Sequence, residues 1–234
     1  MATLREIRRR IRSVRSTAQI TKAMELVAAS RMRRAQEHVL SSRPYEEKMR
    51  VVLGDLTMHT AATSIALHPL LAHHKTGKVC IVAVTSDRGL CGGFNTNMIR
   101  YALEAIEQHR STGDDAVLVT VGKRGRDAMV RMGMHLVAEF TGLADRPTIL
   151  DVAPIVRVLV TGYTDGAFKE VYLGFSRFIS TMTQKPTITR MIPVEHQPSD
   201  PEEGRTRTYD YIFEPSAEAI LNAILPRYIE VQMY

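Results

Sequence analysis

Residues 78–97 read KVCIVAVTSDRGLCGGFNTN, and this stretch decides the fold. Its first part, 78–85, is a short apolar run rich in β-branched side chains, which is typical of a strand buried in a parallel sheet. A glycine-containing turn follows, and a helical pattern of apolar residues then runs over about 96–109. A buried strand, a tight turn and a helix in this order predict the first half of a βαβ unit.

The same alternation continues towards the C-terminus. Further strands are predicted over 116–121, 135–140, 169–176 and 209–213, and helices over about 124–131 and 147–160. Pro154 lies inside the second helix. A Thr-rich extended stretch covers 179–193, and a polar loop covers 195–207. Alternation at these lengths predicts an α/β fold, with a Rossmann-like parallel, doubly wound sheet and helices on both of its faces.

The N-terminal segment keeps one seam whose spacing alternates between three and four residues. Its positions are Leu4, Ile7, Ile11, Val14, Ala18, Thr21, Glu25, Ala28, Met32, Ala35, Val39, Ser42, Glu46, Met49, Leu53 and Leu56. This register predicts a coiled-coil helix, on the order of 75 Å long at about 1.5 Å per residue. Such a helix must protrude from a compact domain. Pro44 is expected to kink or split it.

The seam contains many small residues and two glutamates, so each heptad buries little apolar surface. Two interpretations stay open. The segment is either an ordinary long coiled coil or a shaft that turns inside a partner. Tight binding along the outer face of such a shaft would oppose its rotation. Arginines cover most of its other faces, and a charge-studded helix is usually just solvated.

The C-terminal segment predicts one more helix. Ser216 is its expected N-cap, Pro226 is expected to kink it, and apolar residues recur at helical spacing up to Met233. Its length, about 28 Å at about 1.5 Å per residue, is too short to pair with the N-terminal helix. Either another chain supplies the partner, or the natural sequence continues.

Composition and charge narrow the function classes. Of 234 residues, 44% are hydrophobic, and no stretch is long and apolar enough to predict a membrane span. Two cysteines fit a reducing compartment better than a disulfide framework. Residues 1–50 hold 13 Lys/Arg and 5 Asp/Glu, a net charge of +8. The whole chain has a net charge of +6, so the remaining residues together carry −2. This asymmetry predicts a negatively charged binding partner: nucleic acid, an anionic membrane or an acidic protein surface.

The turn SDRGLCGGFN matches neither the dinucleotide fingerprint nor the P-loop pattern. We therefore interpret Asp87, Arg88, Gly89, Gly92 and Gly93 as a structural turn. No spacing of His, Cys, Asp or Glu is typical of a metal site, and no nucleophile–base arrangement stands out. The sequence predicts no catalytic, cofactor-binding or metal-binding residues.

Three stretches together resemble the gamma subunit of F-type ATP synthases. They are ITKAMELVAASRMRRAQ at 20–36, TSDRGLCGGFNTN at 85–97 and YIFEPSAEAILNAILPRYIEVQMY at 211–234. The resemblance covers essentially the whole chain. It implies a shaft helix over 1–58, an α/β domain over 77–213 and the start of a second shaft helix over 215–234. Family members continue that helix further, so the resemblance implies a truncated form or a fragment.

The function that this resemblance implies is mechanical. The rotor would couple proton-driven rotation of the c-subunit ring to ATP synthesis or hydrolysis in a ring of three alpha and three beta subunits, without an active site or cofactor of its own. Candidate rotor–stator contacts are Arg9, Arg12, Lys22 and Met24. Candidate contacts to the membrane ring are Tyr211, Phe213 and Glu214. Epsilon would be a further partner, and the place would be the cytoplasmic face of a bacterial inner membrane.

Two rival interpretations come from other classes. A nucleic-acid-binding protein with a basic helical arm would show steeply salt-dependent affinity, but the arm has an apolar seam and almost no aromatic residues. A Rossmann-like enzyme with a dimerising coiled coil would need a cofactor fingerprint that the sequence lacks.

Overall fold

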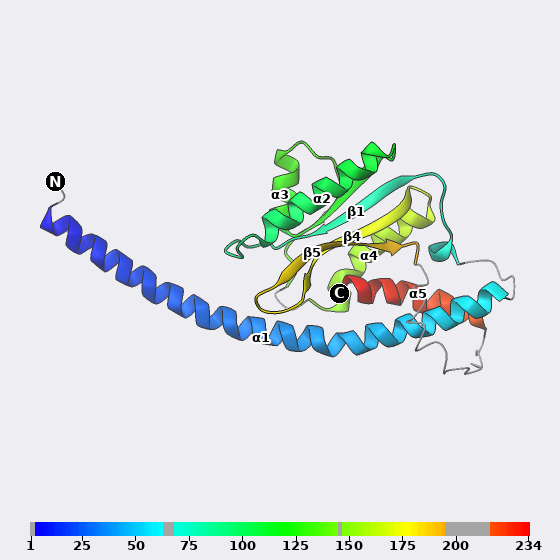
Figure 1. Cartoon of the computed structure of the whole chain (residues 1–234), viewed down its shortest axis with the longest axis horizontal. Coiled ribbons are helices and arrows are strands. Elements are labelled where there is room, and N and C mark those ends of the chain that lie inside the picture. The colour runs from blue at the N-terminus through cyan, green and yellow to red at the C-terminus, as the bar shows by residue number, and fades with distance from the viewer. Residues whose placement is uncertain (1–2, 63–67, 145–146, 195–215) are drawn as a thin grey trace. The chain divides into compact units, whose positions relative to one another are not determined.

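The computed structural model describes residues 3–62, 68–144, 147–194 and 216–234 (Figure 1). Its contacts divide the chain into two compact units, residues 1–48 and 49–234. The three-part organisation expected from the sequence, with segments 1–58, 77–213 and 215–234, stays a prediction.

The first unit consists of most of helix α1, Leu4–Ala62. A reciprocal cap starts this helix: the Glu6 N–H donates to Thr3 Oγ1 at 3.4 Å, and the Thr3 N–H donates to Glu6 Oε2 at 2.9 Å. The helix continues through Pro44, so the split considered from the sequence does not occur. A proline removes one hydrogen bond of the helix, and the turns on either side keep theirs.

The second unit is built on a five-stranded sheet with the order β3-β2-β1-β4-β5. The strands are β1 (Lys78–Val84), β2 (Ala116–Val121), β3 (Leu136–Phe140), β4 (Phe168–Phe178) and β5 (Gln184–Ile192). Pairs β1–β2, β1–β4 and β2–β3 are parallel, which confirms the Rossmann-like core. The β4–β5 pair is antiparallel, so the sheet is mixed. Only residues 179–183 join these strands, and a parallel connection needs a dozen or more.

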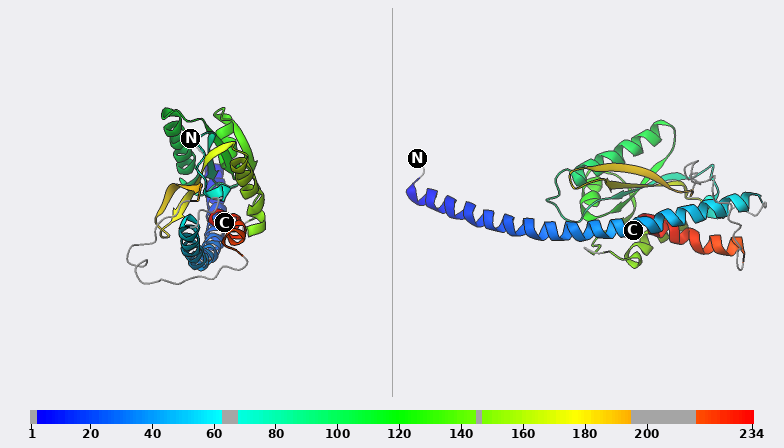
Figure 2. Two further views of the ribbon diagram at one scale, coloured as in Figure 1. Left: turned by 90° about the vertical axis from the view of Figure 1, so that its right-hand side faces the viewer. Right: turned by 60° about the horizontal axis from the view of Figure 1, so that its bottom comes forward.

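Helices cover both faces of this sheet, as Figures 1 and 2 show. They are α2 (Phe94–Ser111), α3 (Lys123–Arg131), α4 (Ile149–Thr164) and α5 (Ala217–Met233), with a short 3₁₀ helix at Pro69–Leu71. Alternate residues of β1 face opposite layers. Val79 and Ile81 pack in one cluster with Ala102 of α2 and Met129 of α3, whereas Cys80 lies in the cluster that α4 and α5 share.

The helix ends and interiors follow local sequence signals. As predicted, Ser216 is the N-cap of α5, and its Oγ accepts from the Ala219 N–H at 3.1 Å. Thr148 and Asp151 form a capping box at the start of α4. Both α4 and α5 continue through their internal prolines, Pro154 and Pro226. Buried side chains of α4 and α5 form one apolar core with Leu53, which is 4% exposed.

Candidate functional site

The four predicted rotor–stator residues, Arg9, Arg12, Lys22 and Met24, all lie on α1 and are all exposed. Lys22 Nζ lies 3.0 Å from Glu25 Oε2, an exposed pair that contributes little to stability. The structure shows no contact that joins the four residues into one cluster within the described part of the chain. Their role in partner contact stays a prediction.

The apolar seam of α1 is exposed along its N-terminal part. Exposed fractions there are 67% at Leu4, 46% at Ile7, 49% at Ile11 and 67% at Val14. A sustained stripe of exposed apolar side chains is typical of an interaction surface rather than of a solvated helix. The arginines and the apolar stripe therefore occupy one helix and are available together to a partner.

The predicted contacts to the membrane ring, Tyr211, Phe213 and Glu214, lie outside the described residues, as do the predicted loop at 195–207 and strand at 209–213. Their assignment stays a prediction. Among the helices that the structure describes, none combines the length and the apolar character that crossing a membrane requires.

The turn between β1 and α2 is held by a single carboxylate. Asp87 Oδ1 accepts from the Lys123 N–H at 2.7 Å, and Asp87 Oδ2 accepts from the Gly142 N–H at 2.9 Å. Lys123 opens α3, and Gly142 follows β3. A carboxylate at a helix N-terminus is stabilised by the exposed N–H groups and the helix dipole. Asp87 thus ties together the three loops that follow β1, β2 and β3.

Thr85 completes this junction. Its Oγ1 donates to the Val121 carbonyl at 3.0 Å and accepts from the Gly125 N–H at 2.9 Å. Gly122 has φ 98°, and a Cβ built there would lie 2.2 Å from the Thr85 carbonyl oxygen. Only glycine fits this close approach between the ends of β1 and β2.

A second set of hydrogen bonds shapes the turn itself. The Ser86 N–H donates to Asn95 Oδ1 at 2.9 Å, and Ser86 Oγ donates to the Arg88 carbonyl at 2.5 Å. Asn95 Nδ2 donates to Cys91 Sγ at 3.1 Å. Sequence reasoning missed Ser86 and Asn95. The available signal was a Ser at the strand end and an Asn in the first helical turn, two residue types that often bond to turn backbones.

The glycines of the predicted structural turn have different surroundings. A Cβ at Gly89 would lie 3.0 Å from Arg124 Nη2, and one at Gly93 would lie 3.1 Å from Asn97 Nδ2. Gly92 has φ 57° and open space around it. Between them Leu90 has φ 64° and is 93% exposed, so the turn presents one apolar side chain to the outside. The structural role assigned to Asp87, Arg88 and the three glycines stays a prediction, and these contacts are consistent with it.

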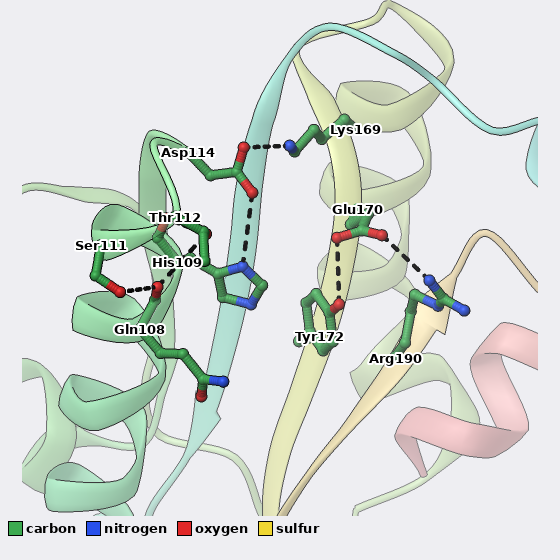
Figure 3. Close-up of polar contacts among 9 residues, drawn as sticks. All are labelled: Gln108, His109, Ser111, Thr112, Asp114, Lys169, Glu170, Tyr172 and Arg190. Atoms are coloured by element: carbon green, nitrogen blue, oxygen red, sulfur yellow. Dashed lines mark hydrogen bonds and ion pairs between the residues drawn. The ribbon is translucent and has the colours of Figure 1, made fainter.

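A charged cluster lies at the other end of the sheet from the Asp87 junction, where the parallel strands begin (Figure 3). Lys169 Nζ of β4 lies 2.5 Å from Asp114 Oδ1, and His109 Nδ1 lies 3.9 Å from Asp114 Oδ2. The Lys169 ammonium, through its hydrogen bond, lowers the pKa of Asp114. No local sequence pattern marks Asp114 and Lys169 as a pair, because they lie 55 residues apart in the chain.

The other half of this cluster joins β4 to β5 (Figure 3). Arg190 Nη1 lies 3.1 Å from Glu170 Oε1, and the Tyr172 hydroxyl donates to Glu170 Oε2 at 3.2 Å. Burial and the neighbouring Glu170 carboxylate raise the pKa of Tyr172. All of these groups are partnered. The Glu170–Arg190 pair therefore fastens β5 to β4, while the Lys169–Asp114 pair joins β4 to the segment before β2.

Among the described residues, neither end of the parallel strands forms a metal site. Among residues 3–62, 68–144, 147–194 and 216–234, no group of three or more His, Cys, Asp or Glu is arranged to hold a metal ion. Cys80 is buried in the core, and burial raises its pKa to about 12, so it is poorly suited to nucleophilic chemistry.

Comparison with known proteins gives one consistent family. The model of the ATP synthase family matches residues 3–234. The chain is 44% identical over 240 residues to the ATP synthase gamma chain of Herpetosiphon aurantiacus, an alignment that covers 100% of this chain and 80% of the relative. It is 42% identical over 234 residues to that of Pelotomaculum thermopropionicum, covering 100% and 79%.

A solved structure agrees at the level of the fold. The central stalk and c-ring of the Tetrahymena thermophila mitochondrial ATP synthase contains a chain that matches with a TM-score of 0.66 at 21% identity. The match covers 92% of this chain and 89% of that one. The long helix attached to a Rossmann-like unit is thus an architecture already known from a central stalk.

Proposed function

Since the chain belongs to the ATP synthase family and is a gamma chain, we propose that it is the rotor of the central stalk, which couples proton-driven rotation of the c-subunit ring to ATP synthesis or hydrolysis. The single observation that supports this most is the match over the whole chain, from the shaft helix to α5. The exposed seam and basic faces of α1 supply the surface that such a rotor needs.

In this proposal the chain carries no active site, and its partners perform the chemistry. A ring of three alpha and three beta subunits would surround α1, while the α/β unit would contact epsilon and the c-subunit ring. The rotor would lie at the cytoplasmic face of a bacterial inner membrane, attached only through the complex.

On α1, the proposed division of roles follows side-chain chemistry. Arg9, Arg12 and Lys22 would attract acidic loops of the surrounding ring, because exposed cations steer association over about one Debye length. Met24, 47% exposed, would supply an adaptable apolar contact. Along the rest of the seam, an apolar helix of the assembled complex would cover the side chains of Ile7 and Ile11.

Reconstitution tests the proposal directly. The full chain is mixed with alpha and beta subunits, and the products are analysed by native mass spectrometry and an ATPase assay. We expect one copy of the chain per three alpha and three beta subunits, with an altered ATPase rate. Absence of association, together with salt-sensitive binding to nucleic acid, would favour the rival basic-arm interpretation.

A charge-reversal pair then tests the assignment of residues. Arg9→Glu/Arg12→Glu should weaken assembly on the order of tenfold, because two attractive charges become repulsive. Lys75→Glu, at an exposed position of the second unit, is the control and should assemble normally. The pair changes the net charge by four and the control by two, so an equal effect per unit of charge would show that net charge, rather than the α1 surface, governs assembly.

A further inference from the structure

Strands β4 and β5 form a hairpin (Figure 1), and its turn carries two exposed apolar side chains. Ile179 is 57% exposed and Met182 is 92% exposed. The turn is ordered by its own hydrogen bonds: the Ser180 N–H donates to the Thr183 carbonyl at 3.0 Å, and the Thr183 N–H donates to Ser180 Oγ at 3.1 Å. The apolar tip is therefore presented in a fixed shape.

Behind this tip two cations oppose each other. Arg177 of β4 and Lys185 of β5 are direct partners in the antiparallel register, and both are exposed. Like charges directly opposite on neighbouring strands destabilise a sheet. Residues 171–194 contain no Asp or Glu, and among the described residues neither cation has an ion-pair partner. This contrasts with Arg190 further along β5, which Glu170 neutralises.

A preformed apolar tip above two cations that no described residue pairs with has the character of a docking surface. Methionine fits irregular apolar contacts well and is enriched at interfaces. Because Arg177 and Lys185 repel each other and no described residue compensates them, their pairing points to negative charge brought by a partner. Membrane-binding segments typically carry about four to eight cations, and this tip has two, which favours a protein over a lipid surface.

We propose that the β4–β5 hairpin tip docks an acidic protein surface of the assembled ATP synthase, one whose carboxylates face Arg177 and Lys185 beside an apolar contact for Met182. The proposal rests on the proposed rotor function for the identity of the complex. It is separate from the candidate contacts on α1, which belongs mainly to the other unit of the chain.

The first test measures the free chain. Lys185→Glu turns the repulsive cross-strand pair into an attractive one, so we expect the Tm of the isolated chain to rise by about 1–3 °C. Lys185→Gln should give a smaller rise, and Lys75→Glu, outside the hairpin, should give none. An unchanged or lowered Tm for Lys185→Glu would overturn the premise that the pair is a cost, whatever happens on assembly.

The second test measures docking in the complex. Binding of the full chain to a mixture of alpha, beta and epsilon subunits is titrated for the wild type, Lys185→Glu, Met182→Ser and Lys75→Glu. We expect Lys185→Glu to raise the Kd on the order of tenfold, most strongly at low salt, and Met182→Ser to raise it at all salt concentrations. The control should match the wild type.

The outcomes separate the two proposals. A wild-type chain that fails to bind overturns the rotor function and this docking with it. Binding by the wild type with an unchanged Kd for both hairpin variants overturns the docking alone. Binding of the free chain to vesicles rich in anionic phospholipid, lost in Lys185→Glu, would overturn the assignment of a protein partner.

Discussion

Replacing Gly122 by alanine tests whether the close approach between β1 and β2 controls the stability of the α/β unit. The residue has φ 98°, and an added Cβ would lie 2.2 Å from the Thr85 carbonyl oxygen and 2.6 Å from its carbon. Both atoms are backbone, so no side-chain rotation relieves the overlap. The ends of β1 and β2 have to move apart.

The expected loss has two parts. Holding alanine in a backbone region that glycine favours costs about 1–3 kcal/mol. Moving the chains apart weakens two short backbone hydrogen bonds, from the Thr85 N–H to the Val121 carbonyl and from the Gly122 N–H to the Phe140 carbonyl, both at 2.7 Å. Each contributes about 1 kcal/mol net. Gly122→Ala should therefore lower the free energy of unfolding by about 3–5 kcal/mol.

Gly113→Ala is a matched control, because Gly113 has a similar φ of 91° but nothing within 4 Å of its added Cβ. It should cost only the backbone part, about 1–3 kcal/mol. Urea unfolding of the 234-residue chain, followed by circular dichroism, measures both variants. Equal losses in the two variants would refute the steric reasoning and leave backbone conformation as the whole effect.

Three further predictions concern single groups. Asp87→Ala removes two charge-assisted hydrogen bonds and should lower the free energy of unfolding by about 2–4 kcal/mol in the same urea assay, with Asp87→Asn losing less because one acceptor remains. In the native chain a thiol reagent should label the exposed Cys91 but not the buried Cys80, whose pKa is raised to about 12, and unfolding should expose both; two fast native thiols would contradict the buried assignment. Because Lys169 lowers the folded pKa of Asp114, their pair stabilises the chain above the unfolded pKa of about 3.9, and this contribution disappears as the pH falls through the folded value. The stability difference between wild type and Lys169→Met should therefore be constant at neutral pH and shrink in acid, and a difference that grows in acid would contradict the pairing.

Local pattern was enough to predict most of the secondary structure. The β-branched run at 78–85 and the apolar spacing after it correspond to β1 and α2, because burial imposes those periods on the sequence itself. The start of α2 lies at Phe94, two residues before the predicted one. Its N-cap is Gly93, which makes no side-chain cap hydrogen bond, so the usual Ser, Thr or Asp signal was missing.

The direction of β5 and the contacts of the site were harder to predict. Strand direction depends on how short the connection is, and the Thr-rich stretch at 179–193 did not reveal where β4 ended. The hydrogen bonds of Asp87 reach residues 36 and 55 positions away, so no local pattern encodes them. The exposed seam of α1 was predictable because it is periodic. Which partner covers it depends on chemistry that lies outside this chain.

The junction around Asp87 uses the first N–H groups of α3 for hydrogen bonds within the chain. In Rossmann-like proteins a helix N-terminus offers its N–H groups to a phosphate. Here the first turn of α3 is already satisfied from within: Lys123 N–H by Asp87, Arg124 N–H by the Ser86 carbonyl, and Gly125 N–H by Thr85. An anion at α3 would have to displace a carboxylate of the protein itself. Through Asp87 the same network joins the loops that follow β1, β2 and β3.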